Sequence, residues 1–133
     1  MFDVRSASSA ALAYLGDSVI EVLVRKRLVQ MGYTSAKSLN AKALFFVRAS
    51  AQAAAMNRIL PLLTEQENAV FHRGRNIGHT STPKSATVGE YRAATGMEAL
   101  FGYLHMTDQQ SRMDELFAAA YPDAVEKHES EEK

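Results

Sequence analysis

The segment from Ala10 to Val24 constrains the fold more than any other part of the sequence. Nearly all of its residues are apolar or small, and the exceptions are Tyr14, Asp17, Ser18 and Glu21. Leu12, Leu15, Val19, Val22 and Leu23 follow the spacing of an α-helix. A helix that is apolar on nearly every side is usually buried on nearly every side. We therefore expect a central helix here, with Asp17 surrounded by other groups.

The rest of the chain also favours helices. It has only three prolines and seven glycines, and no segment alternates β-branched with polar residues for long. With 133 residues, of which 47% are hydrophobic, it can form one compact domain with a substantial core. We predict an all-α fold, a single compact helical domain over residues 1–121, followed by an acidic, solvated tail at residues 122–133.

Capping signals and turn formers divide this domain into elements. We expect five helices, at about residues 8–31, 35–59, 64–73, 85–105 and 107–121. Ser8 or Ser9 can cap the first helix, and Gly32 follows its end. The segments 64–67 and 107–110 both look like capping boxes. Residues 74–84 are rich in turn formers and are expected to form a loop.

Aromatic residues and methionines at helical spacing are expected in the core rather than in a base-stacking surface. They are Phe45, Phe46, Met97, Phe101, Tyr103 and Phe117. The apolar face of the second helix is expected to include Leu39, Leu44, Phe46 and Val47.

Charge and cysteine content narrow the possible functions. The chain has 15 basic and 15 acidic residues, but the tail carries a net −3, so residues 1–121 are mildly basic and could bind an anionic partner. The lack of cysteine excludes disulfide scaffolds, thiol nucleophiles and zinc sites with cysteine ligands. Neither a targeting signal nor an apolar run of roughly 20 residues is apparent. We expect a soluble, cytoplasmic protein without a membrane partner.

Two acids lie in the most apolar helical segments, Asp17 in the first and Glu98 in the fourth. Each has a glycine within a few residues, which allows helices to approach closely. A carboxylate in such a place needs a partner. The two carboxylates could share a hard cation such as Mg²⁺. They could instead form core salt bridges, for example Asp17 with Arg92, and chemistry alone favours this second interpretation.

The residues around these acids resemble a known family. Leu15-Gly16-Asp17-Ser18-Val19-Ile20-Glu21 is similar to the signature segment of the ribonuclease III endonuclease domain. Glu98-Ala99-Leu100-Phe101-Gly102-Tyr103-Leu104 is similar to its second acidic motif. The short chain, without a double-stranded-RNA-binding domain, and the segment His72-Arg73-Gly74-Arg75-Asn76 resemble the compact Mini-ribonuclease III branch. The resemblance covers about residues 6–121.

The resemblance implies a function as well as a fold. Members of the family are homodimers that use Mg²⁺, for which Mn²⁺ can substitute, to cut both strands of double-stranded RNA and leave a 5′-phosphate. The Mini branch is implied to trim the ends of precursor large-subunit (23S) ribosomal RNA. Asp17 and Glu98 then become the catalytic metal ligands. Since the first helix is too apolar for a monomer to cover, Leu12–Val24 is expected at or near a two-fold interface.

The chain departs from the family pattern at three acidic positions, which hold Ala10, Ala13 and Thr95. Only two family ligands remain, so we expect one Mg²⁺ per subunit, completed by water and RNA phosphate. Glu21 is a candidate for supporting the site from behind, and it could equally be an ordinary surface charge. The missing acids leave open a catalytically inactive domain that binds RNA or a ribosomal partner. A helical interaction protein with no nucleic-acid role is a third hypothesis.

The predicted loop and its flanks are the candidate RNA contact. The residues expected to bind RNA are Arg73, Arg75, Asn76, Lys84 and Arg92. Arginine suits bidentate phosphate contacts, and Gly74 and Gly78 could let the backbone approach a phosphate. Without the resemblance, an ordinary solvated loop would be the favoured interpretation. His72 and His79 are expected to bind no metal.

Overall fold

The computed structural model describes residues 2–77 and 86–122, and all regular structure in these two ranges is helical. The predicted all-α fold is therefore confirmed. The main helices are α1 (Ser9–Gln30), α2 (Ala36–Val47), α3 (Ala49–Ile59), α4 (Glu65–Arg75), α5 (Val88–Met106) and α6 (Gln110–Ala120). Two short 3₁₀ helices, η1 (Val4–Ser6) and η2 (Leu60–Leu62), precede α1 and α4. The predicted tail lies almost wholly outside the described residues.

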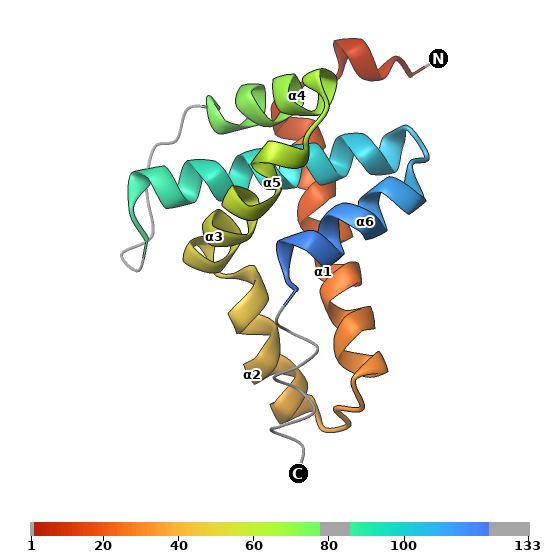
Figure 1. The fold of residues 1–133 in the computed structure, drawn as a ribbon, viewed down its shortest axis with the longest axis vertical. Coiled ribbons are helices and arrows are strands. Elements are labelled where there is room, and N and C mark those ends of the chain that lie inside the picture. The colour runs from red at the N-terminus through yellow and green to blue at the C-terminus, as the bar shows by residue number, and fades with distance from the viewer. Residues whose placement is uncertain (1, 78–85, 123–133) are drawn as a thin grey trace.

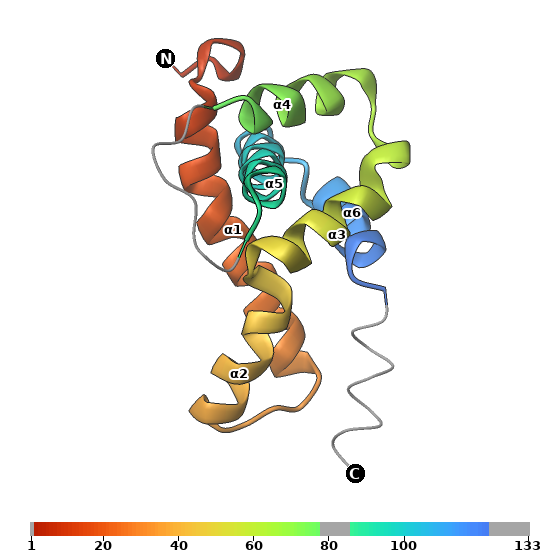
Figure 2. The ribbon, with the colours of Figure 1, turned by 90° about the vertical axis from the view of Figure 1, so that its left-hand side faces the viewer.

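Helix α5 is the centre of the domain. Figure 2 shows it nearly end-on, with α1, α3, α4 and α6 around it. Its ten buried residues include Met97, Phe101 and Leu104, which pack in one cluster with side chains of the surrounding helices. This burial explains why Glu98 is the only acid in the apolar part of α5. Within the described ranges, no helix combines the length and the apolar character that a membrane span requires.

Local capping bonds mark the starts of α1, α2, α4 and α5. The Ser8 hydroxyl accepts a hydrogen bond from the Ala11 backbone N–H, and Gly32 follows α1 with a φ of 96°. The predicted capping box of Thr64 and Glu67 begins α4. An equivalent box at residues 87–90, which our sequence analysis overlooked, begins α5.

The second predicted helix is in fact two helices, so the expectation of one helix over 35–59 is wrong. The chain turns at Arg48, where φ is −66° and ψ is 152°. Helix α2 packs against α1, whereas α3 packs against α5 and α6. No proline or glycine marks the break. Tertiary packing therefore overrides the helical propensity of this alanine-rich stretch.

The predicted capping box at residues 107–110 is also wrong. Helix α6 begins at Gln110, and its N-cap residue Gln109 makes no side-chain capping bond. The Thr107 hydroxyl instead donates to the Tyr103 carbonyl oxygen at 2.8 Å and accepts from the Gln109 amide. Thr107 therefore ends α5 rather than starting α6.

Most of the predicted core is confirmed, with three exceptions on α1 and α2. Phe46, Met97, Phe101, Tyr103 and Phe117 are buried as expected. In contrast, Val22, Leu44 and Phe45 are 64%, 57% and 62% exposed. These three side chains lie on outer helix faces that no other element of the described chain covers.

Candidate active site

Helices α1 and α5 cross at two glycines. A Cβ placed on Gly16 would lie 1.6 Å from the Glu98 carbonyl oxygen, and one on Gly102 would lie 2.0 Å from the Leu12 carbonyl oxygen. Since real Cβ atoms never come so close to backbone atoms, only glycine allows this crossing. The expectation that glycines near the acids permit close helix approach is confirmed.

This crossing brings Asp17 and Glu98 together. The two carboxyl groups are within hydrogen-bonding reach of each other. Burial of Glu98 is the largest cause that raises the pKa of its carboxyl group, and the nearby Asp17 charge adds to it. Together they raise the pKa of Glu98 to about 8. Glu98 is half-buried, whereas Asp17 is exposed on the surface of the single chain.

The exposure of Asp17 corrects the expectation that other groups surround it. The outer face of α1 contains Tyr14, Asp17, Ser18 and Val22, all of which are exposed. Neither Asp17 nor Glu98 forms an ion pair with an arginine in the parts of the chain that the structure describes. The core salt bridges considered as an alternative are therefore absent from those parts.

The donor chemistry of this pair suits a hard divalent cation. Two carboxyl groups that disfavour simultaneous ionisation offer only oxygen ligands, and a cation between them would remove their repulsion. Mg²⁺ is commonly held by one or two carboxylates together with water and substrate phosphate. Among the described residues, no cluster of three or more histidine, cysteine, aspartate or glutamate side chains is present. The residues therefore fit a site with two protein ligands.

The positions where the family pattern has further acids are occupied differently. Ala13 is buried in α1, and Thr95 is buried in α5. The Thr95 hydroxyl donates to the Tyr91 carbonyl oxygen at 3.0 Å, which leaves it turned toward its own helix. Ala10 is exposed near the start of α1. None of these three side chains can replace a metal-binding carboxylate.

Glu21 lies one helical turn after Asp17 and pairs with Arg25. The Arg25 Nε atom is 2.9 Å from a Glu21 carboxylate oxygen. This is an ordinary i,i+4 pair on a helix surface. A supporting role for Glu21 behind the site stays a prediction.

The candidate RNA-binding residues lie on two adjacent helices. Arg73 and Arg75 belong to the last turn of α4, Asn76 is its C-cap, and Arg92 is exposed near the start of α5. Arg92 and Glu98 are six positions apart on α5, which corresponds to about 9 Å along the helix axis. Lys84, like Gly78 and His79, lies outside the described residues.

Gly74 has a different role from the one expected. It is a buried residue of α4 rather than part of the loop, and a Cβ on it would lie 2.6 Å from the Ala99 Cβ and 3.1 Å from the Gly96 Cα. Gly74 therefore allows α4 to pack closely on α5. The expectation that its backbone approaches a phosphate is wrong, because the helix contact occupies that space.

An exposed stripe along α1 agrees with the expectation that a single chain cannot cover this helix. Tyr14, Val22 and Val29 are 85%, 64% and 65% exposed. Together with Ser18 and Arg25 they repeat every three or four residues and so share one helix face. The signal was present in the sequence, since this helix carries more apolar residues than one buried face requires.

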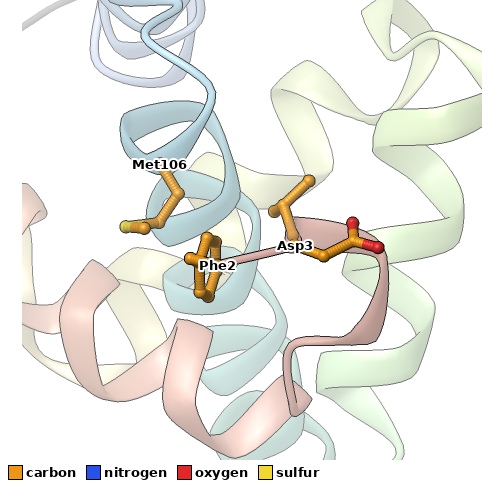
Figure 3. Close-up of a pocket in the computed structure, with 4 residues that line it drawn as sticks. Phe2, Asp3 and Met106 are labelled. Carbon is orange, nitrogen blue, oxygen red and sulfur yellow. The ribbon is translucent and has the colours of Figure 1, made fainter.

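A shallow pocket lies away from the carboxylate pair. Phe2, Asp3, Val4 and Met106 line it, where the N-terminal segment meets the end of α5 (Figure 3). The Asp3 carboxylate, its one acid, pairs with Arg5 at 3.2 Å. Nothing in this lining suggests catalysis.

Comparison with known proteins agrees with the helical fold and identifies a family. Residues 10–109 match the Ribonuclease III domain family. A Mini-ribonuclease 3 from Symbiobacterium thermophilum is 49% identical over 109 residues, which cover 82% of this chain and 84% of that protein. Another from Enterococcus faecalis is 42% identical over 118 residues, which cover 87% of this chain and 89% of that protein.

A solved structure agrees as well. The crystal structure of protein FN1578 from Fusobacterium nucleatum superimposes with a TM-score of 0.86 at 29% identity, over 96% of this chain and 98% of that one. The chain belongs to the ribonuclease III family, and within it to the Mini-ribonuclease 3 proteins. It is an endoribonuclease of the ribonuclease III type, that is, a phosphodiester hydrolase.

Proposed function

We propose that this endoribonuclease cleaves double-stranded RNA in a Mg²⁺-dependent reaction, with Asp17 and Glu98 as the catalytic metal ligands. The observation that carries the proposal is the meeting of these two carboxyl groups at the crossing of α1 and α5. Mn²⁺ can take the place of Mg²⁺, since it accepts the same oxygen ligands. With Ala13 and Thr95 in place of family acids, one ion per subunit is the expected number.

The chain's own residues have simple roles in this mechanism. Bound Mg²⁺ would supply an activated water and a positive charge beside the scissile phosphate. Asp17 offers an exposed carboxylate at the surface that RNA can reach, and Glu98 offers a half-buried one behind it. Gly16 and Gly102 hold the two helix backbones at the distance that keeps both carboxyl groups together. Glu21 is proposed to support Asp17 from the next turn.

Basic residues on α4 and α5 are proposed to bind the RNA backbone. Arg73, Arg75, Asn76 and Arg92, with Lys84, would contact phosphates and position the duplex. A-form RNA is recognised mainly through its shape, phosphates and 2′-hydroxyl groups, so weak sequence preference is expected. We propose precursor 23S ribosomal RNA as the substrate and the cytoplasm as the location, because the two acidic motifs and the short chain resemble those of the Mini-ribonuclease III branch.

The exposed stripe on α1 supports a homodimer. Tyr14, Val22 and Val29 form a row of large apolar side chains that a second copy of the chain can cover. A symmetric dimer would place two carboxylate pairs on one duplex, one for each strand. Light scattering at micromolar concentration tests this: we expect a dimer that Val22→Glu disrupts, and a wild-type monomer would count against it.

The proposed activity is tested by incubating duplex and single-stranded RNA of the same sequence with the protein and Mg²⁺. We expect cleavage of the duplex only, with products that carry a 5′-phosphate. No cleavage is expected in EDTA. Binding of duplex RNA without cleavage in Mg²⁺ or Mn²⁺ would favour an inactive RNA-binding domain instead. If the protein binds no duplex RNA even at low salt, a protein without a nucleic-acid role would be favoured.

A further inference from the structure

The charges of the chain are distributed very unevenly. Between residues 22 and 64 there are seven basic side chains and no acidic one. They are Arg25, Lys26, Arg27, Lys37, Lys42, Arg48 and Arg58. The acidic tail, residues 122–133, has five acids and two lysines. The two segments therefore carry opposite net charges.

The basic residues gather in one lobe of the molecule. Figure 1 shows α2 and the C-terminal half of α1 at the end of the molecule opposite α4, with α3 leading back from them to α5. Residues 36–48 alone contain three bases, of which Lys37 and Arg48 are exposed. We call the C-terminal half of α1, α2 and α3 the basic lobe.

The outer face of α2 combines these cations with exposed apolar groups. Phe45 is exposed, with the Lys42 Nζ atom 5.8 Å and the Arg48 guanidinium carbon 5.3 Å from its ring centroid. Leu44 beside it is exposed as well. We call Lys37, Lys42, Leu44, Phe45 and Arg48 the α2 face. No element of the described chain covers it.

The chain enters the acidic tail while held against this lobe. The buried Tyr121 donates a hydrogen bond from its hydroxyl to the Phe46 carbonyl oxygen at 2.8 Å, and the two rings are 5.0 Å apart. Arg58 donates to the Ala120 carbonyl oxygen at 2.7 Å. The first acid of the tail, Asp123, therefore follows Tyr121 by two residues at an anchor on α2 itself.

The tail is also long enough to cover the α2 face. Eleven residues, 123–133, can extend about 36 Å at most, given roughly 3.3 Å per residue. The twelve residues of α2 span about 18 Å. Anchoring at Tyr121 raises the local concentration of the tail near α2, so a weak contact can still be well populated.

We propose that the acidic tail docks on the α2 face and screens the basic lobe from other polyanions. Its carboxylates would pair with Lys37, Lys42 and Arg48, which belong to a stretch, residues 22–64, that contains seven basic residues and no acidic one. Docking of this kind makes the tail an internal competitor for phosphate backbones. The contact itself does not depend on the proposed activity, but the competition with RNA rests on it.

Carbodiimide cross-linking of the full-length protein tests the contact directly. At low salt, we expect tail carboxylates to cross-link to Lys37 and Lys42, and the products to disappear at high salt. A chain with Asp123→Asn and all four tail glutamates changed to Gln is the control for reactivity. No cross-links to α2, or equal yields at Lys84, would overturn the proposal.

An isotope-mixing version of this experiment shows whether the tail bound to the α2 face belongs to the same chain or to a second copy. When unlabelled and ¹⁵N-labelled chains are mixed, an intramolecular contact gives cross-links between peptides of the same label only. Mixed-label products beside the same-label ones would show that a second copy supplies the tail, which contradicts the proposal.

Duplex RNA binding tests the competition. The chain with the neutralised tail should bind duplex RNA several-fold more tightly than wild type at low salt. That gain should vanish when Lys42→Gln and Arg48→Gln are added. If the neutralised tail still tightens RNA binding equally in the Lys42→Gln, Arg48→Gln background, the tail acts only through its net charge. The proposed competition between the tail and RNA would then be rejected. If no variant binds RNA, the proposed function fails, whereas the cross-links still decide the contact.

Discussion

The carboxyl groups of Asp17 and Glu98 lie within hydrogen-bonding reach of each other, although they belong to different helices. No arginine pairs with either acid within the described ranges. Burial and the charge of Asp17 raise the pKa of Glu98 to about 8, so at neutral pH the metal-free pair holds a proton. A bound cation would take the place of that proton. The same two carboxyl groups would therefore affect stability, metal binding and catalysis.

The raised pKa predicts how stability depends on pH in EDTA. Because the folded-state pKa of Glu98 is about 8 and the unfolded value is near 4.5, the native state binds more protons between these values. The free energy of unfolding should therefore fall as pH rises from about 5 to 8, by at most about 1.4 kcal/mol per pH unit. Urea titrations across this range measure it.

Two variants and one addition sharpen that test. Glu98→Gln should remove most of the slope, whereas Asp114→Asn, which changes an exposed acid on α6, should leave it unchanged. Saturating Mg²⁺ should flatten the wild-type slope. An identical slope in wild type and Glu98→Gln would show that the pair does not retain a proton.

Gly16→Ala should damage both stability and activity. Its Cβ would lie 1.6 Å from the Glu98 carbonyl oxygen, so α1 and α5 must separate. We expect a loss of roughly 1–3 kcal/mol or more and weak cleavage even at low temperature. Gly89→Ala is the matched control, since its nearest neighbour would be 3.9 Å away and alanine favours a helix. Thermal melts with wild-type stability for Gly16→Ala would refute the crossing geometry.

Arg112→Ala should behave as the loss of a true core salt bridge. Arg112 holds the buried Glu67 carboxylate with two bonds of 2.9 and 2.8 Å, and this pairing lowers the pKa of Glu67. Removing the arginine strands a buried charge and should cost about 3–5 kcal/mol. Glu115→Gln, which alters only the exposed partner of Arg112, should cost far less. Equal effects in chemical denaturation would contradict this role.

Arg73→Ala should weaken duplex RNA binding and reduce its salt dependence without unfolding the protein. Arg73 is exposed at the end of α4, and each lost phosphate contact lowers the salt slope by about one unit. Lys84→Ala is expected to act in the same way. Arg5→Ala is the control, because Arg5 pairs with Asp3 at the N-terminal end. Filter binding at several salt concentrations measures both effects. If neither Arg73→Ala nor Lys84→Ala changes duplex RNA binding, the RNA must bind elsewhere on the protein.

Most helices could be predicted from the sequence because local signals encode their ends. Ser8, Gly32 and the box at Thr64 define helix ends by hydrogen bonds to nearby backbone. The break at Arg48 was not predictable in this way, because distant helices decide it. Likewise, Gly74 looked like a loop residue until the packing of α4 on α5 was known.

Exposure was the other property that the sequence could not supply. The apolar pattern of α1 shows that the helix avoids water, but it does not say whether its own chain or a second copy covers each face. Asp17 was therefore expected to be surrounded by other groups, whereas the single chain leaves it exposed. The pairing of Asp17 with Glu98, in contrast, follows from two glycines whose positions the sequence already displays.

The cleavage and stability of Asp17→Asn, Glu98→Gln and the double variant, measured together, test the central claim most directly. If the two carboxylates hold one Mg²⁺, each single variant should lose nearly all cleavage of duplex RNA, and the double variant should be hardly worse. Thermal melts in EDTA should show unchanged or higher stability, because the chain no longer has to bury an ionisable carboxyl group beside a second one. Variants that unfold easily yet still cut duplex RNA would contradict the account.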